Sequence, residues 1–544
     1  MRYLKLFSFL LFACFITGPL LLSAQVLPPV QNSSTPADST RNIDILNSRH
    51  LTILKVNDST TLQILAGAVR LKQGSTLFNC DSCVINNNTK TFEAWGNVHI
   101  NDADTANMYS SHLRYLIDKK LAYLDGGVKL TDGKGTLTTP DLEYDMTTDI
   151  GIYKHGGKVV NKKTVLTSQE GYYYAGLRDI YFKNKVELKD PAYYIKTDSL
   201  LYNTQSQTTR FIAKTFIRDS SGRTIETSDG FYNMATGRAE FGSRPIIKDK
   251  GLTIIGDNVI FNDSLGIAQA RGNVIIIDST QGTTIIAGEV FRDNKKDRLL
   301  ATRKPLMIIK QEKDSIYIAA DTLFSARLTD LYGKKDSLVK DTVKGTKLVN
   351  VNNKDSTNRY FEAYRHVRIF SDSLQSVCDS LFYSFKDSTF RLYQQPILWA
   401  KGSQVTGDTI FLFTKNKKAD LVKVFENSFL INELDPGVYN QVKSTRMDAY
   451  FKDGEMDSVR ASGFAECIYY IQDDDSAYTG VNQSKCDVMD IYFDKEGLKK
   501  VVFRSAVTGT IWPMKMKSPS EMRLENFHWL DERRPKTKLE LFSD

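Results

Sequence analysis

The sequence has few of the residues from which metal and catalytic sites are built. Its 544 residues include only six cysteines and six histidines. Gly-x-Ser-x-Gly, His-Glu-x-x-His and the glycine-rich phosphate loop are all missing from the chain. The histidines show no metal-ligand spacing, and they are His50, His99, His112, His155, His366 and His528. We therefore predict that the protein is not an enzyme and needs no metal or cofactor.

Cysteine is too sparse for a disulfide-rich scaffold. Cys80-Asp-Ser-Cys83 is a single Cys-x-x-Cys, without the second pair that a zinc site requires. In an oxidising compartment we expect Cys80 and Cys83 to form a local disulfide. Cys467 and Cys486 flank neighbouring predicted strands, which makes them candidates for a second disulfide.

Long hydrophobic runs are also missing, with one exception at the start of the chain. There a basic beginning is followed by an apolar run to Leu22, and Leu22-Ser-Ala24 fits a cleavage site. We predict a signal peptide at residues 1–24 and, from its Pro, Ser, Thr and Asn, a linker at 25–50. No later segment approaches the ~20 apolar residues of a membrane helix, so we expect an exported protein.

What the sequence does contain is one strand pattern, copied many times. Residues 92–100, Phe-Glu-Ala-Trp-Gly-Asn-Val-His-Ile, alternate between apolar and polar positions as a half-buried strand does. The pattern returns at residues 268–276, where Gly-Asn-Val-x-Ile is repeated, and again at 361–369. Gly or Pro precedes the apolar pair in several copies, which predicts a bulge where a strand passes from one sheet to another.

A second motif, Asp-x-Leu-x-Tyr, gives the period. Its central residues Val84, Leu113 and Leu142 lie 29 positions apart, and Leu200 follows after twice that interval. A fixed period of this size is typical of a repeat architecture. We count about thirteen repeats between residues 51 and 510, interrupted by a Lys-rich loop insertion at 329–357.

Two short strands per ~29-residue repeat, with no helical pattern between them, predict an all-β fold. A parallel β-helix and an elongated repetitive β-jelly roll both satisfy the period, and the Gly- and Pro-marked corners favour the jelly roll. With one strand per repeat in each sheet, the rod would be roughly 60 Å long. Residues 511–544 are predicted to form a capping tail. Ser518-Pro519 begins a short C-terminal helix that carries Leu524, Phe527 and Leu530 at helical spacing.

The repeated Gly-Asn-Val-x-Ile and Asp-x-Leu-x-Tyr strands behind a signal peptide resemble the OstA-like (organic-solvent-tolerance-like) proteins. These are relatives of the lipopolysaccharide-transport bridge LptA and of the N-terminal domain of LptD. The resemblance covers roughly residues 51–510. It implies a periplasmic protein, associated with outer-membrane biogenesis, whose β-jelly roll shields lipopolysaccharide acyl chains in an apolar groove. The chain departs from the family pattern in its many repeats and its Lys-rich insertion.

A lipid groove needs an apolar lining, and residues of one strand parity supply candidates for it. They are Val98, Ile100, Val128, Leu130, Val186, Leu188, Val274, Ile276, Val367 and Ile369. The same residues also fit an ordinary core between two sheets, so both interpretations stay open.

The implied partners are lipopolysaccharide, or its lipid A acyl chains, and other jelly-roll Lpt-type components. The latter would bind by edge-strand pairing, since an open stack leaves unpaired strand edges that also permit self-association. Nucleic acid is not expected, because a net charge of +8 is scattered over an exported chain. The alternatives are a structural or adhesive β-repeat surface protein and, ranked lower, a solenoid polysaccharide-active enzyme.

Overall fold

A computed structural model describes most of the chain after the predicted leader. The described residues are 42–102, 106–310, 315–332, 358–415, 418–452, 455–473, 475, 477–494 and 497–542. The predicted signal peptide, residues 25–41 of the predicted linker and residues 333–357 of the Lys-rich insertion lie outside them.

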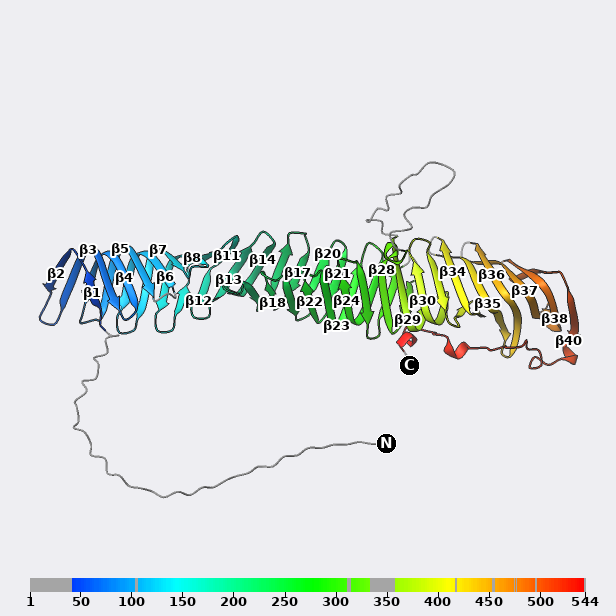
Figure 1. The fold of residues 1–544 in the computed structure, drawn as a ribbon. Coiled ribbons are helices and arrows are strands. Elements are labelled where there is room, and N and C mark those ends of the chain that lie inside the picture. The colour runs from blue at the N-terminus through cyan, green and yellow to red at the C-terminus, as the bar shows by residue number, and fades with distance from the viewer. Residues whose placement is uncertain are drawn as a thin grey trace, which may run out of the picture.

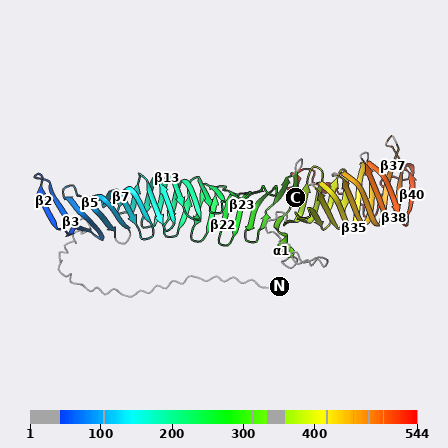
Figure 2. The same ribbon diagram turned by 90° about the horizontal axis from the view of Figure 1, so that it is seen from above.

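The molecule is a long rod of antiparallel strands that follow one another in chain order (Figure 1). The view from above shows the same elongated outline (Figure 2). The all-β fold class predicted from the repeats is confirmed. Within the described residues the only α-helix is α1, Leu328–Tyr332, which includes the first residues of the predicted Lys-rich insertion, and no helix is long and apolar enough to cross a membrane.

The strands of the N-terminal part are β1 Asp44–Asn47, β2 His50–Lys55, β3 Thr61–Gln73, β4 Thr76–Asn86, β5 Thr91–Asp102, β6 Ala106–Leu116, β7 Leu121–Thr131, β8 Thr136–Asp145, β9 Ile150–Tyr153, β10 Gly157–Asn161, β11 Thr164–Ser168, β12 Glu170–Tyr174, β13 Asp179–Lys189 and β14 Tyr193–Asn203. Those of the middle are β15 Thr208–Phe211, β16 Thr215–Asp219, β17 Thr224–Thr227, β18 Asp229–Asn233, β19 Arg238–Gly242, β20 Ile246–Asp249, β21 Leu252–Ile255, β22 Asn258–Asn262, β23 Ile267–Asp278, β24 Thr283–Asp293, β25 Arg298–Thr302, β26 Leu306–Lys310, β27 Ser315–Ala319 and β28 Thr322–Arg327. Those of the C-terminal part are β29 Arg359–Phe370, β30 Gln375–Ser384, β31 Thr389–Tyr393, β32 Ile397–Ala400, β33 Ser403–Thr406, β34 Thr409–Lys415, β35 Lys418–Asp435, β36 Val438–Lys452, β37 Glu455–Gln472, β38 Tyr478–Asp494, β39 Gly497–Arg504 and β40 Thr508–Pro513.

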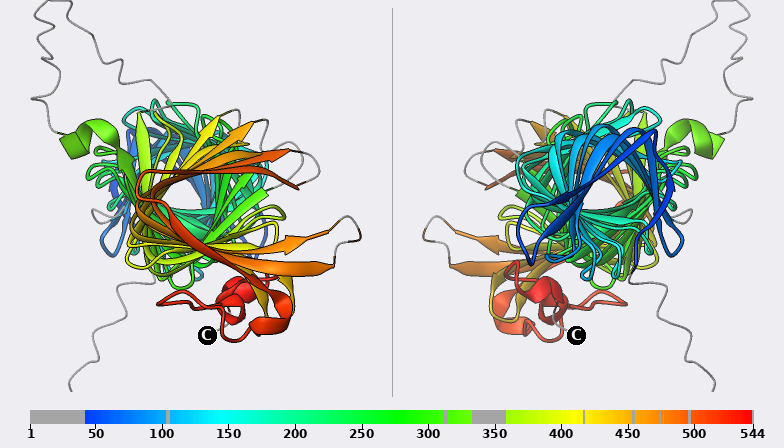
Figure 3. Two further views of the ribbon diagram at one scale, coloured as in Figure 1. Left: turned by 90° about the vertical axis from the view of Figure 1, so that its right-hand side faces the viewer. Right: turned by 90° about the vertical axis from the view of Figure 1, so that its left-hand side faces the viewer.

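Long strands bend once and so belong to two facing walls. In β5, residues Thr91–Trp95 pair with one set of neighbouring segments and Val98–Asp102 with another, and the register shifts between the two. We call the layer that contains Thr91–Trp95 wall 1 and the layer that contains Val98–Asp102 wall 2. Seen along the rod, the walls enclose a common interior (Figure 3).

Each repeat supplies two strands to each wall, whereas one strand per wall was predicted. The pair β5 and β6 shows this, since both strands cross the corner and both contribute to walls 1 and 2. The prediction was wrong because each of the two strands in a repeat was taken as short and assigned to one sheet, whereas each is long and bends into both walls. The rod is therefore about twice the roughly 60 Å expected from one strand per repeat.

The Gly-Asn pair forms the corner between the walls. Gly96 and Asn97 both have left-handed backbone, with φ of 75° and 42°, and they make the bulge that was predicted from Gly and Pro. The Asn97 amide donates to Asp81 Oδ2 at 2.8 Å, and Asn273 makes the same bond to Asp257. At the third copy His366 Nδ1 lies 3.0 Å from Asp321 Oδ2.

The C-terminal tail contradicts the predicted helix. Within residues 514–542 the only helical geometry is in short 3-10 turns at Met514–Met516, Asp531–Arg533 and Glu540–Phe542. The tail runs back along the rod from β40 towards β29 (Figure 1). Leu524 and Leu530, which share a helical face in the prediction, instead pack into two different apolar clusters of wall 2.

Two further predictions differ from the structure. Residues 44–50, assigned to the linker, already form β1 and the start of β2, both paired with β3. The predicted disulfides are not formed, because Cys80, Cys83, Cys467 and Cys486 are buried free thiols. Cys467 is opposite Ser484, while Cys486 is opposite Ala465, so the two cysteines of the second predicted pair are not directly opposite each other on β37 and β38.

Candidate functional site

All ten predicted groove residues face the interior, and all ten lie on wall 2. They are at most 4% exposed, and they belong to one apolar cluster that extends from Leu65 in β3 to Ile491 in β38. The interior of this structure is therefore a filled core rather than an open groove. Wall 1 supplies the opposite half of the lining, with Leu113 and Tyr115 among its members.

The wall 1 residues were missed, although the sequence marks them. The Leu and Tyr of the Asp-x-Leu-x-Tyr motif have the same strand parity, and both point inward. The tyrosines recur at intervals of 29 or 30 residues, and we call them the tyrosine ladder: Tyr115, Tyr144, Tyr173, Tyr202 and Tyr232. Burial raises the pKa of Tyr115, Tyr173 and Tyr202, which keeps these phenols neutral.

A row of polar residues at the turns of wall 2 faces the tyrosine ladder. It repeats with the same period and consists of Gln73, Asp102, Asp132, Asn161, Asp190, Asp219, Asp249 and Asp278. This row meets the turns of wall 1 along one edge of the rod, on the side opposite the corners. We call this edge the seam. The aspartates also serve their own turns, since Asp132 Oδ1 accepts from Lys134 and Gly135 N–H.

Side chains close the seam. Tyr115 donates its hydroxyl hydrogen to Gln73, and the amide of Asn161 lies 3.3 Å from the Tyr202 hydroxyl. Further along, Thr204 Oγ1 donates to Asp132 Oδ2 at 3.1 Å. These contacts join residues that are 41 to 72 positions apart in the chain. The corner, by contrast, is closed by continuous backbone.

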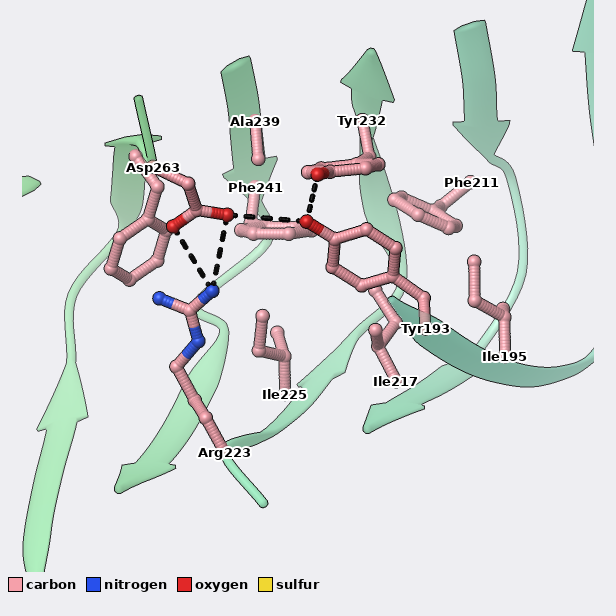
Figure 4. Close-up of a pocket in the computed structure, with 11 residues that line it drawn as sticks. Tyr193, Ile195, Phe211, Ile217, Arg223, Ile225, Tyr232, Ala239, Phe241 and Asp263 are labelled. Carbon is pink, nitrogen blue, oxygen red and sulfur yellow. Dashed lines mark hydrogen bonds and ion pairs between the residues drawn. The ribbon is translucent and has the colours of Figure 1, made fainter. Parts of the chain in front are cut away.

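One polar part of the seam borders a hollow and is drawn in Figure 4. Arg223 donates to both oxygens of Asp263, at 3.1 and 3.3 Å, and its Nε lies 2.9 Å from Asp219 Oδ2. The hydroxyl of Tyr193 contacts both Tyr232 and Asp263. Burial lowers the pKa of Arg223, but the two carboxylates outweigh this effect and raise it. The guanidinium therefore stays charged between the walls.

The hydrogen-bonded ladders of the two walls are independent of the seam. Neither wall loses a backbone hydrogen bond of its strands if the seam separates, because only side-chain contacts cross it. Among the described residues, no three His, Cys, Asp or Glu side chains lie close enough together to hold a metal ion.

Comparison with known proteins finds a family match in the N-terminal part of the chain. Residues 40–198 match the family model described as OstA-like protein. This match confirms the predicted resemblance over that part of the chain.

One solved structure with some likeness is LptH from Pseudomonas aeruginosa, described as the LptA homologous periplasmic component of the lipopolysaccharide transport device. The likeness covers 26% of this chain and 81% of that chain, at 11% identity and a TM-score of 0.19. Such a distant likeness carries no argument about function. A search of the curated proteins found no match.

Proposed function

We propose that this protein binds the acyl chains of lipopolysaccharide between its two walls, as a periplasmic bridge or assembly factor in lipopolysaccharide transport to the outer membrane. The observation that carries the proposal is the interior itself, a single apolar cluster that runs along the rod and is closed on one side only by side chains. The OstA-like match of residues 40–198 supports the same assignment.

The energetics favour a carrier of this kind. Exposing an acyl chain of about fourteen carbons to water costs on the order of 10 kcal/mol, at ~0.8 kcal/mol per methylene. When the two walls separate, their apolar side chains lose contact with the facing wall. An acyl chain between the walls contacts those side chains instead, so the apolar surfaces remain covered. Each seam hydrogen bond contributes only about 0.5–1.5 kcal/mol, so a local stretch of seam can open while the corner holds the walls together.

The N-terminal end has the properties of a docking edge. Strand β2 pairs with β3 along one side, and its apolar side chains are exposed, with Leu51 at 52%, Ile53 at 67% and Leu54 at 47%. Exposed apolar edges pair readily with another strand. We infer that this edge binds the end of a protein of similar fold or of a second copy.

Lipid analysis of the purified full chain tests the proposed function. We expect native mass spectrometry of protein from the cell envelope to release lipopolysaccharide or its acyl chains in a fixed ratio to protein. A soluble β-sheet protein prepared in parallel should carry none. Protein that is free of lipid, and that fails to bind added lipopolysaccharide, would contradict the proposal.

A further inference from the structure

The tyrosine ladder changes character past the middle of the rod. After Tyr232 the corresponding position is Phe261, and in the next two repeats it is occupied by Arg292 and Ser325. Arg292 lies directly opposite Ala268 on one side and Leu299 on the other, both of which belong to the apolar core. Its side chain therefore points toward the interior, where earlier repeats have a phenol ring.

Two more arginines share this orientation. Arg327 and Arg359 are directly opposite each other on β28 and β29, and they have the parity of the interior residues Ser325 and Phe361. Like charges directly opposite on neighbouring strands destabilise a sheet unless an anion lies between them. The structure provides one carboxylate, that of Asp297 in the turn between β24 and β25.

Among the described residues, the Asp297 carboxylate alone lies within 4.0 Å of all three guanidinium groups. Asp297 Oδ2 accepts from Arg327 Nε at 3.0 Å and from Arg359 Nη1 at 2.7 Å, while Arg292 Nη2 is 3.9 Å from Oδ1. The cluster of Arg292, Arg327, Arg359 and Asp297, here called the arginine cluster, thus has two positive charges in excess. Its arginine side chains are 24–34% exposed, so a ligand can reach them from the seam.

Charges from the facing wall leave this excess largely in place. Burial lowers the pKa of Arg292, and Asp249 and Asp278 of wall 2 raise it only as secondary contributions. Neither aspartate forms an ion pair with Arg292 among the described residues. A hollow whose polar lining is Arg223, Asp249, Arg292 and Asn294 connects Arg292 of the cluster to the apolar interior at Phe261 and Ala268.

We propose that the arginine cluster is a binding site for a phosphate monoester, held at the seam beside the apolar interior. Guanidinium forks match phosphate oxygens bidentately, and a doubly charged phosphate balances the excess of two. Arg359 also donates to Ser325 Oγ, which places a hydroxyl beside the cluster. The site rests on the proposed function in one respect: the phosphate would belong to the headgroup of the lipid whose acyl chains enter the interior.

The test measures binding of glucose 1-phosphate by calorimetry, with glucose as the uncharged comparison. We expect the full chain to bind glucose 1-phosphate and not glucose. Arg292→Tyr, which restores the ladder residue, and Arg327→Gln should each weaken binding at least tenfold. Arg210→Tyr makes the same change at an exposed position of β15 and should leave affinity unchanged. Thermal melting checks that all variants fold.

Equal affinity in Arg292→Tyr and Arg210→Tyr, or equal binding of glucose, would overturn the phosphate site. Competition identifies the source of the phosphate. Displacement by phosphorylated lipid A, but not by its dephosphorylated form, supports the lipid headgroup. Displacement by inorganic phosphate alone would overturn the assignment to a lipid headgroup, and the cluster would then be a site for free phosphate. Lipid capture by the interior does not depend on these outcomes, so the two proposals can fail separately.

Discussion

At the scale of single residues, the corner glycines explain why one short motif recurs along the chain. Gly96 and Gly272 both have left-handed backbone, and a Cβ on either would lie 2.4 Å from a carboxylate oxygen, that of Asp81 or of Asp257. The same carboxylates bond the asparagine that follows each glycine. The motif is therefore a structural requirement of the bend between the walls.

Replacing Gly272 by Ala should destabilise the fold by more than the same change at Gly282. Both positions have left-handed backbone, which costs an L-residue roughly 1–2 kcal/mol. Only Gly272 adds a clash, because nothing lies within 4 Å of a Cβ at Gly282. Urea denaturation of the two variants measures the difference, and equal midpoints would show that Asp257 does not restrict this corner.

The buried tyrosines predict how stability depends on alkaline pH. Burial raises the pKa of Tyr115 and Tyr173, and it raises that of Tyr153 to about 12. A phenol whose pKa is higher in the folded state contributes its full stability below pH ~10, the pKa of the unfolded chain. That contribution is lost as the pH rises from about 10 through 12. Stability should therefore be constant up to pH ~10 and fall above it.

Absorbance of phenolate at 295 nm, recorded together with far-ultraviolet circular dichroism, follows this transition. The buried tyrosines should ionise only as the sheet signal disappears. Ionisation of all tyrosines in one step near pH 10, with the sheet signal intact, would contradict their burial.

At the scale of strands and segments, the tail is held by three buried glutamines of wall 2. The side chain of Gln441 accepts from Leu524 N–H at 2.8 Å and donates to Met522 C=O at 2.9 Å. Gln404 makes the same pair of bonds to Leu530 and His528, both at 2.7 Å. Gln375 accepts from Arg534 Nε at 2.9 Å. Gln441 and Gln404 therefore bond the tail backbone as a neighbouring strand would, whereas Gln375 holds a tail side chain.

Gln441→Ala and Gln404→Ala should release different parts of the tail. Loss of a buried partner leaves tail backbone groups unpaired, at a cost of about 1–3 kcal/mol each. We expect faster amide exchange at Leu524 in Gln441→Ala and at Leu530 in Gln404→Ala, measured by hydrogen–deuterium exchange. Each variant serves as the control for the other. Equal exchange along the whole tail in both variants would show that the tail is released as one unit.

The elements also show what the sequence could predict and what it could not. Alternation predicted the strands and the glycines predicted the corners, because both depend on local backbone geometry. The tail helix was wrong because helical spacing of Leu524, Phe527 and Leu530 is equally satisfied by an extended segment that meets successive pockets. The sequence did contain a signal that something covers the outer face of wall 2. Strands β32 and β35 have three consecutive apolar residues each, at 397–399 and 429–431. Such runs are typical of strands buried on both faces.

The seam was less accessible to sequence analysis than the strands. Its contacts join residues 41 to 72 positions apart, so they depend on how the two walls meet. Several of the periodic aspartates bond their own turns, which is the usual role of aspartate at such positions. Their second oxygen, as in the bond from Thr204 to Asp132, acts across the seam.

At the scale of the whole molecule, the rod has an edge strand, β2, with exposed apolar side chains at its N-terminal end. If β2 pairs with a second copy, Ile53→Lys should prevent it, because a charge on an edge strand opposes pairing. Light scattering over a range of concentrations should show the wild-type mass rising and the variant remaining monomeric. A wild-type protein that is monomeric at all concentrations would contradict self-association. The remaining hypothesis would be that β2 pairs with another protein of similar fold.

The central claim is that acyl chains lie between the walls, and photo-crosslinking in cells tests it most directly. A photoreactive residue at Val98 or Val274, both interior, should capture lipopolysaccharide. At Ile277, which lies on the same strand as Val274 and is 40% exposed, it should not. Capture at interior positions alone is the predicted result. Silence at all ten interior positions, or equal capture at Ile277, would contradict the account.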